Sequence, residues 1–208
     1  MDFAETEEQQ MIREMVREFA ETVAGPTCEK RDKEQIAPIK EFKKFAELGF
    51  AGMTIPEQYG GQKLDDISEA IVIEELSRVD PSLGVMVAVH VGLCSMTIAL
   101  SGNEAQKEKY LPKLASGEFL GAYSLSEAGS GTDAAAMVTK ATDDGDCYTL
   151  NGEKMWVTNG TTADLFVLFA KVTDHPDYGK KSHGGVTCFI IEKGFEGFEI
   201  GKKEDKPV

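Results

Sequence analysis

Two short segments in the second half of the chain carry hydroxyl, glycine and aromatic residues at spacings that suit ligand binding. The first is the loop Ser124–Thr132, in which hydroxyl side chains at 124, 126, 130 and 132 alternate with Gly129 and Gly131. Backbone N–H groups of such a loop can approach a phosphate closely and hold it without basic side chains. An ordinary Ser/Gly surface loop would have the same composition, so both interpretations stay open.

The second segment runs from Lys154 to Gly160 and contains Trp156, the only tryptophan of the chain, with Thr158 two residues later. A flat indole face beside a hydroxyl donor suits a planar ring as the ligand. A core tryptophan on a hairpin is locally the more common arrangement, and it stays open as the alternative.

The stretch Gly129–Ala134 also matches the G-x-G-x-x-A pattern of dinucleotide-binding folds. That pattern binds pyrophosphate only where its last small residue opens a crossover helix within a βαβ unit. Here the strand-like Val138–Thr142 and then a turn follow, which leaves no room for such a helix. A nicotinamide-dependent Rossmann enzyme is therefore the weaker alternative.

The charge of the chain excludes several classes of partner. Its 208 residues include 22 Lys and Arg against 36 Asp and Glu, a net charge of −14. Without a basic face, neither nucleic acid nor an anionic membrane surface is an expected partner. An anionic ligand must then be held locally, by backbone and hydroxyl donors.

Neither a metal site nor membrane insertion is expected. Four cysteines lie far apart, without the spacing of zinc ligands, and are interpreted as free thiols. The acidic N-terminus resembles neither a signal nor a transit peptide, so we expect a cytoplasmic protein, or else the mature form of a mitochondrial matrix protein. The uncharged stretch Leu83–Leu100 is long enough to span a membrane but lacks anchoring flanks, which favours a buried core helix.

The first half of the chain, which precedes these segments, has the periodicity of helices. Phe3–Val23 places Met11, Met15, Phe19 and Val23 four residues apart, with Ile12 and Val16 beside them, which predicts an amphipathic helix. Further helices are expected over Pro38–Leu48, from Asp65 or Asp66 to Arg78, from Asp80-Pro81 to Leu100, and over Asn103–Ala115.

After Gly117 the pattern changes to short β-branched or aromatic runs separated by turns. Helices followed by strands indicate an α+β protein with a helical domain, residues 1–117, and an antiparallel β-barrel or sandwich domain, residues 118–208. The strands are expected at 120–125, 136–142, 147–151, 155–158, 165–172, 186–192 and 198–200.

The two ligand-binding segments together resemble a known family. Tyr123–Asp133 and Trp156–Gly160 are similar to the two flavin-binding signatures of the acyl-CoA dehydrogenase family. Further stretches stand in the family's order and spacing, and the short-chain, butyryl-CoA-type members are most similar. They are Pro56–Gly61, Glu74–Ser77, Gln106–Pro112 and Gly201–Lys206.

The resemblance implies FAD as cofactor and a helical domain followed by a β-barrel domain. It implies that Ser126 donates to the flavin ring, that Trp156 covers one ring face and that Thr158 bonds flavin N5. Thr132 would contact the pyrophosphate and approach the thioester substrate. The full set of cofactor-binding residues so implied is Tyr123, Ser124, Leu125, Ser126, Gly131, Thr132, Trp156, Val157 and Thr158. Ala128 departs from the family, which usually has proline there.

The implied activity is α,β-dehydrogenation of an acyl-CoA to a trans-2-enoyl-CoA, with electrons passed to an electron-transfer flavoprotein. In the family the catalytic base lies on a C-terminal four-helix domain that also builds a tetramer, and that domain would lie beyond Val208. No catalytic residue is therefore assigned, and the chain is interpreted as a truncated enzyme segment or, alternatively, as a silent interaction fragment. His90 and Glu127 are interpreted as structural residues.

Overall fold

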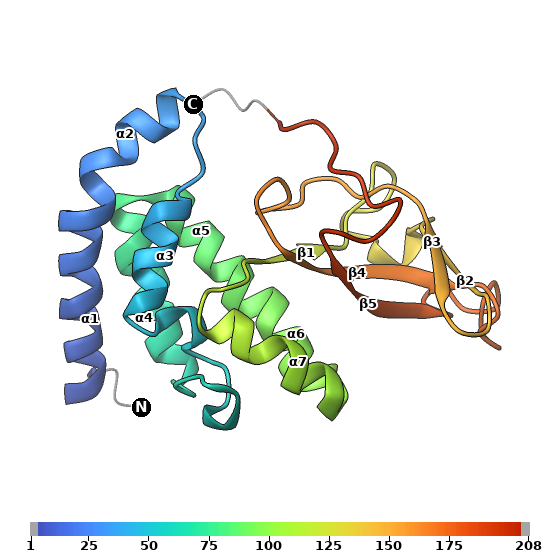
Figure 1. Cartoon of the computed structure of the whole chain (residues 1–208), viewed down its shortest axis with the longest axis horizontal. Coiled ribbons are helices and arrows are strands. Elements are labelled where there is room, and N and C mark those ends of the chain that lie inside the picture. Colours follow the sequence, from blue (N-terminus) through green and yellow to red (C-terminus); the bar gives the residue numbers. More distant parts are fainter. Residues whose placement is uncertain (1–3, 205–208) are drawn as a thin grey trace. The chain divides into compact units, whose positions relative to one another are not determined.

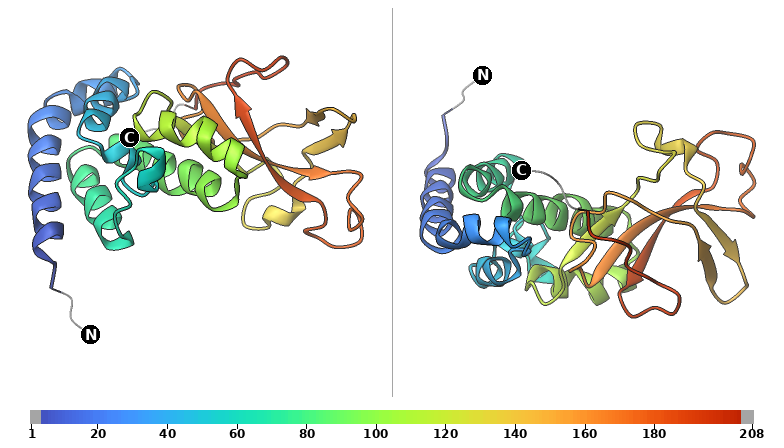
Figure 2. Two further views of the ribbon diagram at one scale, coloured as in Figure 1. Left: turned by 60° about the horizontal axis from the view of Figure 1, so that its bottom comes forward. Right: turned by 90° about the horizontal axis from the view of Figure 1, so that it is seen from above.

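The computed structural model describes residues 4–204, which belong to two compact units, Met1–Gly121 and Ala122–Val208 (Figure 1). The first unit is helical and the second is built around a sheet, which confirms the α+β class. In both views of Figure 2 the helices of the first unit are blue to green and the strands of the second are yellow to red.

Consecutive helical segments make up the first unit, and those predicted between 38 and 115 coincide closely with observed helices. The α-helices are α1 (Glu7–Phe19), α2 (Gly25–Lys33), α3 (Ile39–Glu47), α4 (Asp66–Val79), α5 (Pro81–Ala88), α6 (Met96–Ser101) and α7 (Glu104–Ala115). Between them lie the π-helical segments η1 (Ala20–Ala24) and η4 (Val89–Ser95) and the 3-10 turns η2 (Phe50–Gly52) and η3 (Glu57–Tyr59).

Side-chain caps explain where α1, α4, α5 and α7 begin. Thr6 and Asn103 form capping boxes with the glutamines three residues later. Asp65 accepts from the N–H of Ser68 at 2.7 Å, and Asp80 accepts from that of Leu83 at 3.1 Å. Each cap satisfies a backbone donor that has no partner within its helix, which fixes the first turn.

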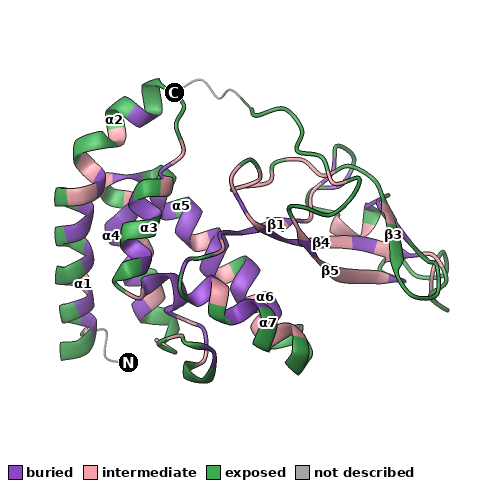
Figure 3. Ribbon diagram, in the orientation of Figure 1, coloured by how far each residue is buried: buried purple, intermediate pink, exposed green. Residues whose placement is uncertain are grey.

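The buried face of α1 contains only part of the apolar residues in its sequence. Ile12, Val16 and Phe19 are buried in the core, where the Phe19 ring lies 5.1 Å from that of Phe45. Met11 and Met15 are 61% and 49% exposed, so these two apolar residues of the predicted amphipathic helix lie outside the core. Figure 3 shows this one-sided burial along α1. The pair Met11 and Met15 and the pair Ile12 and Val16 both have helical spacing. The position of the neighbouring helices decides which pair is buried.

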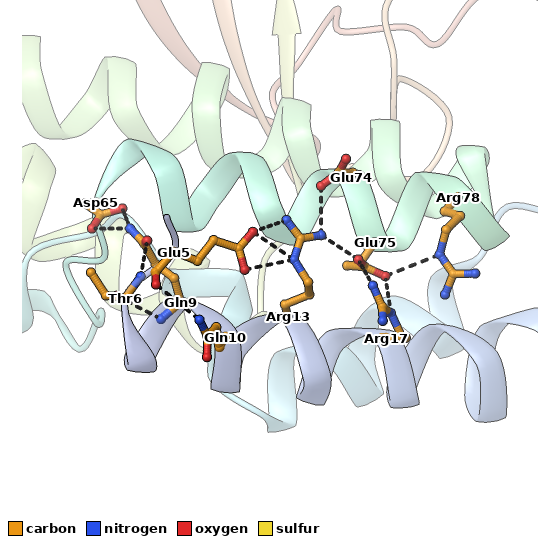
Figure 4. A network of polar contacts seen from close by, with 10 residues as sticks. All are labelled: Glu5, Thr6, Gln9, Gln10, Arg13, Arg17, Asp65, Glu74, Glu75 and Arg78. Carbon is orange, nitrogen blue, oxygen red and sulfur yellow. Dashed lines mark hydrogen bonds and ion pairs between the residues drawn. The ribbon is translucent and has the colours of Figure 1, made fainter. Parts of the chain in front are cut away.

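A buried carboxylate joins α1 to α4. The side chain of Glu75 is 2% exposed and accepts from Arg13 at 2.6 Å and from Arg17 at 2.8 Å. Figure 4 shows this cluster, to which Arg78 of α4 also belongs, at 3.3 Å from Glu75. The hydrogen bonds from Arg17, opposed by burial and reinforced by Arg13, lower the pKa of Glu75 to about 2.

The end of the first unit is held by a glycine and a histidine. Gly117 follows α7 with φ +69°, and a Cβ there would come within 2.4 Å of the Ala46 Cβ, so only glycine fits. His90 is fully buried: its Nδ1 accepts from the N–H of Gly121 at 3.0 Å, and its Nε2 lies 3.2 Å from the Leu114 carbonyl. Burial lowers the pKa of His90 to about 4, so the ring is neutral and structural, as interpreted from the sequence.

The helical segments from α5 to α6 run together as Pro81–Ser101, the one stretch in the described residues that is long and apolar enough to cross a membrane by length and composition. Of its most apolar window, 56% is buried inside the protein. Its Leu83, Val87 and Val91 belong to the core of the first unit. This burial is what a core helix of a folded unit requires.

The sheet of the second unit contains β1 (Gly121–Ser124), β2 (Lys140–Asp143), β3 (Tyr148–Asn151), β4 (Leu165–Val172) and β5 (Val186–Glu192). β2 and β3 form an antiparallel hairpin, and β4 pairs with β5 over its length, with Leu165 opposite Glu192. A hydrophobic core lies on this sheet, and half of its buried residues come from β4. They are Phe166, Leu168, Ala170 and Val172 of β4, with Ala122, Ala141, Ala163 and Ile191.

The expected antiparallel barrel is not confirmed in the residues that the structure describes. β2 runs parallel to β4, pairing Lys140 with Lys171, so the sheet is mixed, and it is not closed. Residues 155–158 and 198–200, predicted as strands, form turns and irregular structure. Residues 134–136 form the 3-10 turn η5 (Ala134–Ala136) rather than a crossover helix, as the argument against a Rossmann fold required.

Candidate functional site

The Ser/Gly loop begins where β1 ends and is folded back on itself by a tight turn. The N–H of Glu127 donates to the Ser130 carbonyl at 2.9 Å, and that of Ser130 donates back at 3.1 Å. The Ser130 side chain is buried, and its hydroxyl donates to the Asp133 carbonyl at 2.9 Å. This hydroxyl therefore stabilises the loop and does not face a ligand.

The two loop glycines have room around them. A Cβ built on Gly129 or Gly131 would meet nothing within 4 Å, and neither residue has a positive φ. The chain itself thus gives no steric or conformational reason for glycine at these positions. Close approach of a ligand to the loop backbone does give one, and it is the use that glycine has in phosphate-binding loops.

The tryptophan segment lies directly against this loop. The N–H of Met155 donates to the Ser126 carbonyl at 2.9 Å. The Lys154 ammonium group donates to the Leu125 carbonyl at 3.0 Å and to the Glu127 carboxylate at 2.6 Å. Two segments almost thirty residues apart in sequence are therefore held side by side within one unit.

Trp156 has a backbone conformation that tryptophan rarely adopts. Its φ is +58°, and its side chain is 61% exposed. Positive φ interrupts an extended chain, which explains why the predicted strand at 155–158 does not form. Strained backbone at a bulky residue is found mainly at functional sites, and here it presents a large aromatic side chain to the surface.

The residues after Trp156 form a turn. Val157 packs against the core of the second unit, and its carbonyl accepts from the N–H of Gly160 at 2.9 Å. Thr158 is half-buried and Asn159 has φ +67°. The core contact of Val157 fixes this turn to the sheet while Trp156 stays exposed.

The remaining predicted residues lie along β1 and its loop. The Tyr123 ring is half-buried at 5.1 Å from the Phe169 ring of β4, and burial raises its pKa. Ser124 is buried at the end of β1, and Leu125 and Ser126 are half-buried. Gly131 and Thr132 lie farther along, in the exposed part of the loop.

Two charged residues inside the site were not among the predicted ligand-binding residues. The side chains of Glu127 and Lys154 are 4% and 6% exposed. Burial alone would raise the pKa of Glu127, but hydrogen bonds from Lys154, Thr139 and Val138 outweigh it and lower that pKa to about 2. The only signal in the sequence is that each of the two segments, otherwise nearly uncharged, contains one charged residue, and that the two charges have opposite signs.

The other candidate groups stand apart from this arrangement. Among residues 4–204, no group of three or more His, Cys, Asp or Glu side chains is placed to hold a metal ion. His175 and His183 are exposed. The candidate donors of this site are backbone N–H groups and hydroxyls, and the Trp156 side chain beside them is exposed.

Comparison with known families gives two matches that together span most of the chain. Residues 6–118 match the N-terminal domain of acyl-CoA dehydrogenases, and residues 122–207 match their middle domain.

Individual relatives agree with these matches. The short-chain-specific acyl-CoA dehydrogenase of Clostridium acetobutylicum is 45% identical over 99% of this chain and 53% of its own length. An electron-transferring flavoprotein structure of Acidaminococcus fermentans superimposes with a TM-score of 0.92 at 47% identity, covering 99% and 53% of the two chains. An acyl-CoA dehydrogenase of Bacillus anthracis in complex with FAD superimposes with a TM-score of 0.87 at 36% identity. The match covers 97% of this chain and 33% of that chain. The chain thus spans about half the length of the curated relatives it matches.

Proposed function

The chain belongs to the acyl-CoA dehydrogenase family, and on this basis we propose that it forms the part of an FAD-dependent acyl-CoA dehydrogenase that holds the flavin ring. One observation supports the proposal most strongly. The Met155 N–H donates to the Ser126 carbonyl at 2.9 Å, so the two segments that resemble flavin signatures form one surface.

Each proposed role rests on the resemblance of the residue's segment to a flavin signature of the family. Ser126 donates to the flavin ring from near the start of the Ser/Gly loop, and Trp156 covers one ring face with its exposed indole. Thr158 donates to flavin N5, and Thr132 contacts the pyrophosphate and the thioester. Tyr123, Ser124, Leu125, Gly131 and Val157 complete the proposed lining.

The cofactor fits the donor set of the site. FAD carries two phosphates, and an acidic chain can bind them only through local donors, which the open backbone at Gly129 and Gly131 supplies. When bound, FAD supplies the acceptor for a hydride from the substrate. The chain's own residues bind and orient the flavin and exclude water from one of its faces.

The proposed reaction is α,β-dehydrogenation of an acyl-CoA to a trans-2-enoyl-CoA. The similarity to a short-chain-specific relative favours a short acyl chain as the substrate. The likeness to an electron-transferring flavoprotein structure supports such a flavoprotein as the electron acceptor. We assign no catalytic base among the described residues, and a tetramer and a cytoplasmic location are part of the same proposal.

Titration of the 208-residue chain with FAD tests the proposal. Trp156 is the only tryptophan, so its fluorescence reports on this surface alone. We expect saturable quenching of that fluorescence and a visible spectrum that differs from free FAD. A chain that retains no flavin at any concentration would favour the alternative, a catalytically silent interaction fragment, and binding of NAD instead would restore the Rossmann alternative.

A matched pair of variants tests the role of Thr158. Thr158→Val removes the proposed donor to N5, whereas Thr161→Val makes the same change at an exposed neighbouring position. We expect Thr158→Val alone to alter the spectrum of the bound flavin. Equal spectra for the two variants would remove Thr158 from the site.

A further inference from the structure

The Glu127–Lys154 pair is a buried ion pair between the two segments of the candidate site. The Lys154 Nζ lies 2.6 Å from Glu127 Oε1, and both side chains are almost fully buried within the second unit. Burying two charges is costly, and a buried pair usually contributes little net stability. Its presence between two loops therefore calls for an explanation other than stability alone.

The hydrogen bonds of the pair reach three separate segments. Besides Lys154, the Glu127 carboxylate accepts from the N–H of Val138 at 2.6 Å and of Thr139 at 3.1 Å. The Lys154 ammonium group donates in addition to the Leu125 carbonyl at 3.0 Å. Both charges are thus compensated and directionally fixed, which makes the arrangement rigid.

The three segments have no regular hydrogen-bond ladder of their own. Residues 125–131, 137–139 and 152–158 lie outside the described strands. The first and third are joined by the backbone bond from Met155 to Ser126 and by the side chain of Lys154. One backbone bond allows two loops to rotate about it, whereas a second link beside it removes that freedom.

We propose that Glu127 and Lys154 are positioning residues, which lock Ser126 and the Trp156–Thr158 turn in the one geometry that fits the flavin ring. The inference rests on the proposed function and deepens it. Neither residue touches the flavin. They act because each is next to, or two residues from, a residue proposed to contact the ring, and a rigid supporting contact preserves such a geometry before the ligand arrives.

The test compares FAD affinity with thermal stability in the complete 208-residue chain. Lys154→Met leaves the Glu127 carboxylate without its ammonium partner, while Lys154→Arg keeps a positive charge. The control is Arg31→Met, which breaks another buried ion pair, at 2.6 Å to Asp80, in the first unit. Titration with FAD, the visible spectrum of the bound flavin and the melting temperature are measured for all of them.

We expect Lys154→Met to weaken FAD binding by about ten-fold or more, with a changed flavin spectrum, and Lys154→Arg to recover most of the affinity. Arg31→Met should lower the melting temperature yet leave FAD affinity within about two-fold of the wild type, because it acts in the other unit. If the wild type binds FAD and Lys154→Met binds it equally well, the positioning role is wrong. If the wild type itself binds no FAD, the proposed function fails first.

Amide hydrogen exchange of the FAD-free chain supplies a readout that does not need flavin. Glu127→Gln and Lys154→Met should both speed exchange at residues 125–131 and 154–158 by a larger factor than in β4 and β5. Unchanged exchange in the two loops would overturn the inference. An equal acceleration in the two loops and in β4 and β5 would show only a general loss of stability and would overturn it as well.

Discussion

The two units use a buried glutamate in different ways. Glu75 and Glu127 are nearly inaccessible, and both have a pKa of about 2. Glu75 accepts from arginine side chains on α1 and α4, two helices whose caps and apolar faces already specify them. Glu127 accepts from backbone N–H groups and one lysine in irregular segments. The first carboxylate fastens elements that exist without it, whereas the second gives shape to loops.

The glycines of the two units differ in the same sense. Gly117 in the first unit is required by its positive φ and by its contact with Ala46, while Gly129 and Gly131 in the second unit face open space. A residue demanded by packing serves the fold. Open space at Gly129 and Gly131 leaves room for a ligand to approach the backbone of the candidate site.

Acidification should weaken both units and is the largest expected effect. Because the folded-state pKa values of Glu75 and Glu127 lie below the ordinary 4.5, their contribution to stability is present above pH 4.5 and is lost as pH falls toward about 2. Urea unfolding between pH 7 and 2.5, followed by helical circular dichroism for the first unit and Trp156 fluorescence for the second, measures both. Glu127→Gln should flatten the pH dependence of the fluorescence transition only. If this variant also flattened the pH dependence of the circular dichroism transition, Glu127 would not act on the second unit alone.

Breaking the Glu75 cluster should have the next largest effect. Glu75→Gln leaves Arg13 and Arg17 without their shared charge and should destabilise the first unit by about 3 kcal/mol, the low end for a buried pair because Arg17 is half exposed. Urea unfolding of the helical signal measures it. FAD affinity should stay unchanged, in contrast to Lys154→Met. A weakened affinity would mean that the comparison between the two carboxylates does not hold.

The glycine comparison is tested by two alanine substitutions. Gly117→Ala should cost about 2 kcal/mol, because the new Cβ overlaps Ala46 and φ is positive. Gly129→Ala should leave the unfolding free energy nearly unchanged but weaken FAD binding. Urea unfolding and FAD titration are measured for both variants. Normal FAD affinity in Gly129→Ala would mean that FAD does not approach the backbone closely at this glycine.

The smallest effect is the coupling within the Glu127–Lys154 pair. In a double-mutant cycle with Glu127→Gln and Lys154→Met, we expect the double variant to be less destabilised than the sum of the single ones by about 1 kcal/mol. Removing both partners leaves no uncompensated buried charge. Trp156 fluorescence during urea unfolding reports the cycle, and strict additivity would mean that the two groups do not interact in solution.

Much of the helical unit could be predicted from the sequence because its signals are local. Asp65 before Ser68, Asp80-Pro81 and Asn103 mark helix starts through bonds that span only three residues. The bounds of β4 and β5 followed from β-branched and apolar runs for the same reason. Which apolar residues of α1 are buried does not follow from the sequence, because Met11 and Met15 have the same helical spacing as Ile12 and Val16, and the neighbouring helices decide between them.

For the candidate site, the sequence pointed to both segments but not to how they are joined. The resemblance of Tyr123–Asp133 and Trp156–Gly160 to flavin signatures rests on residue types in order. That Lys154 reaches Glu127 and Leu125, and that Trp156 has positive φ, depends on contacts between distant parts of the chain. The parallel pairing of β2 with β4 is likewise a long-range property.

The sequence by itself determined the family, the two-part α+β organisation and the acidic character that leaves phosphate binding to backbone and hydroxyl donors. These are properties of residue types and short spacings. The tertiary structure alone decided that the Ser130 hydroxyl donates a hydrogen bond within its own loop, and that Glu127 and Lys154 join the two candidate segments. Hydrogen bonds and buried ion pairs depend on which groups meet in space, and that is fixed only when the whole unit packs.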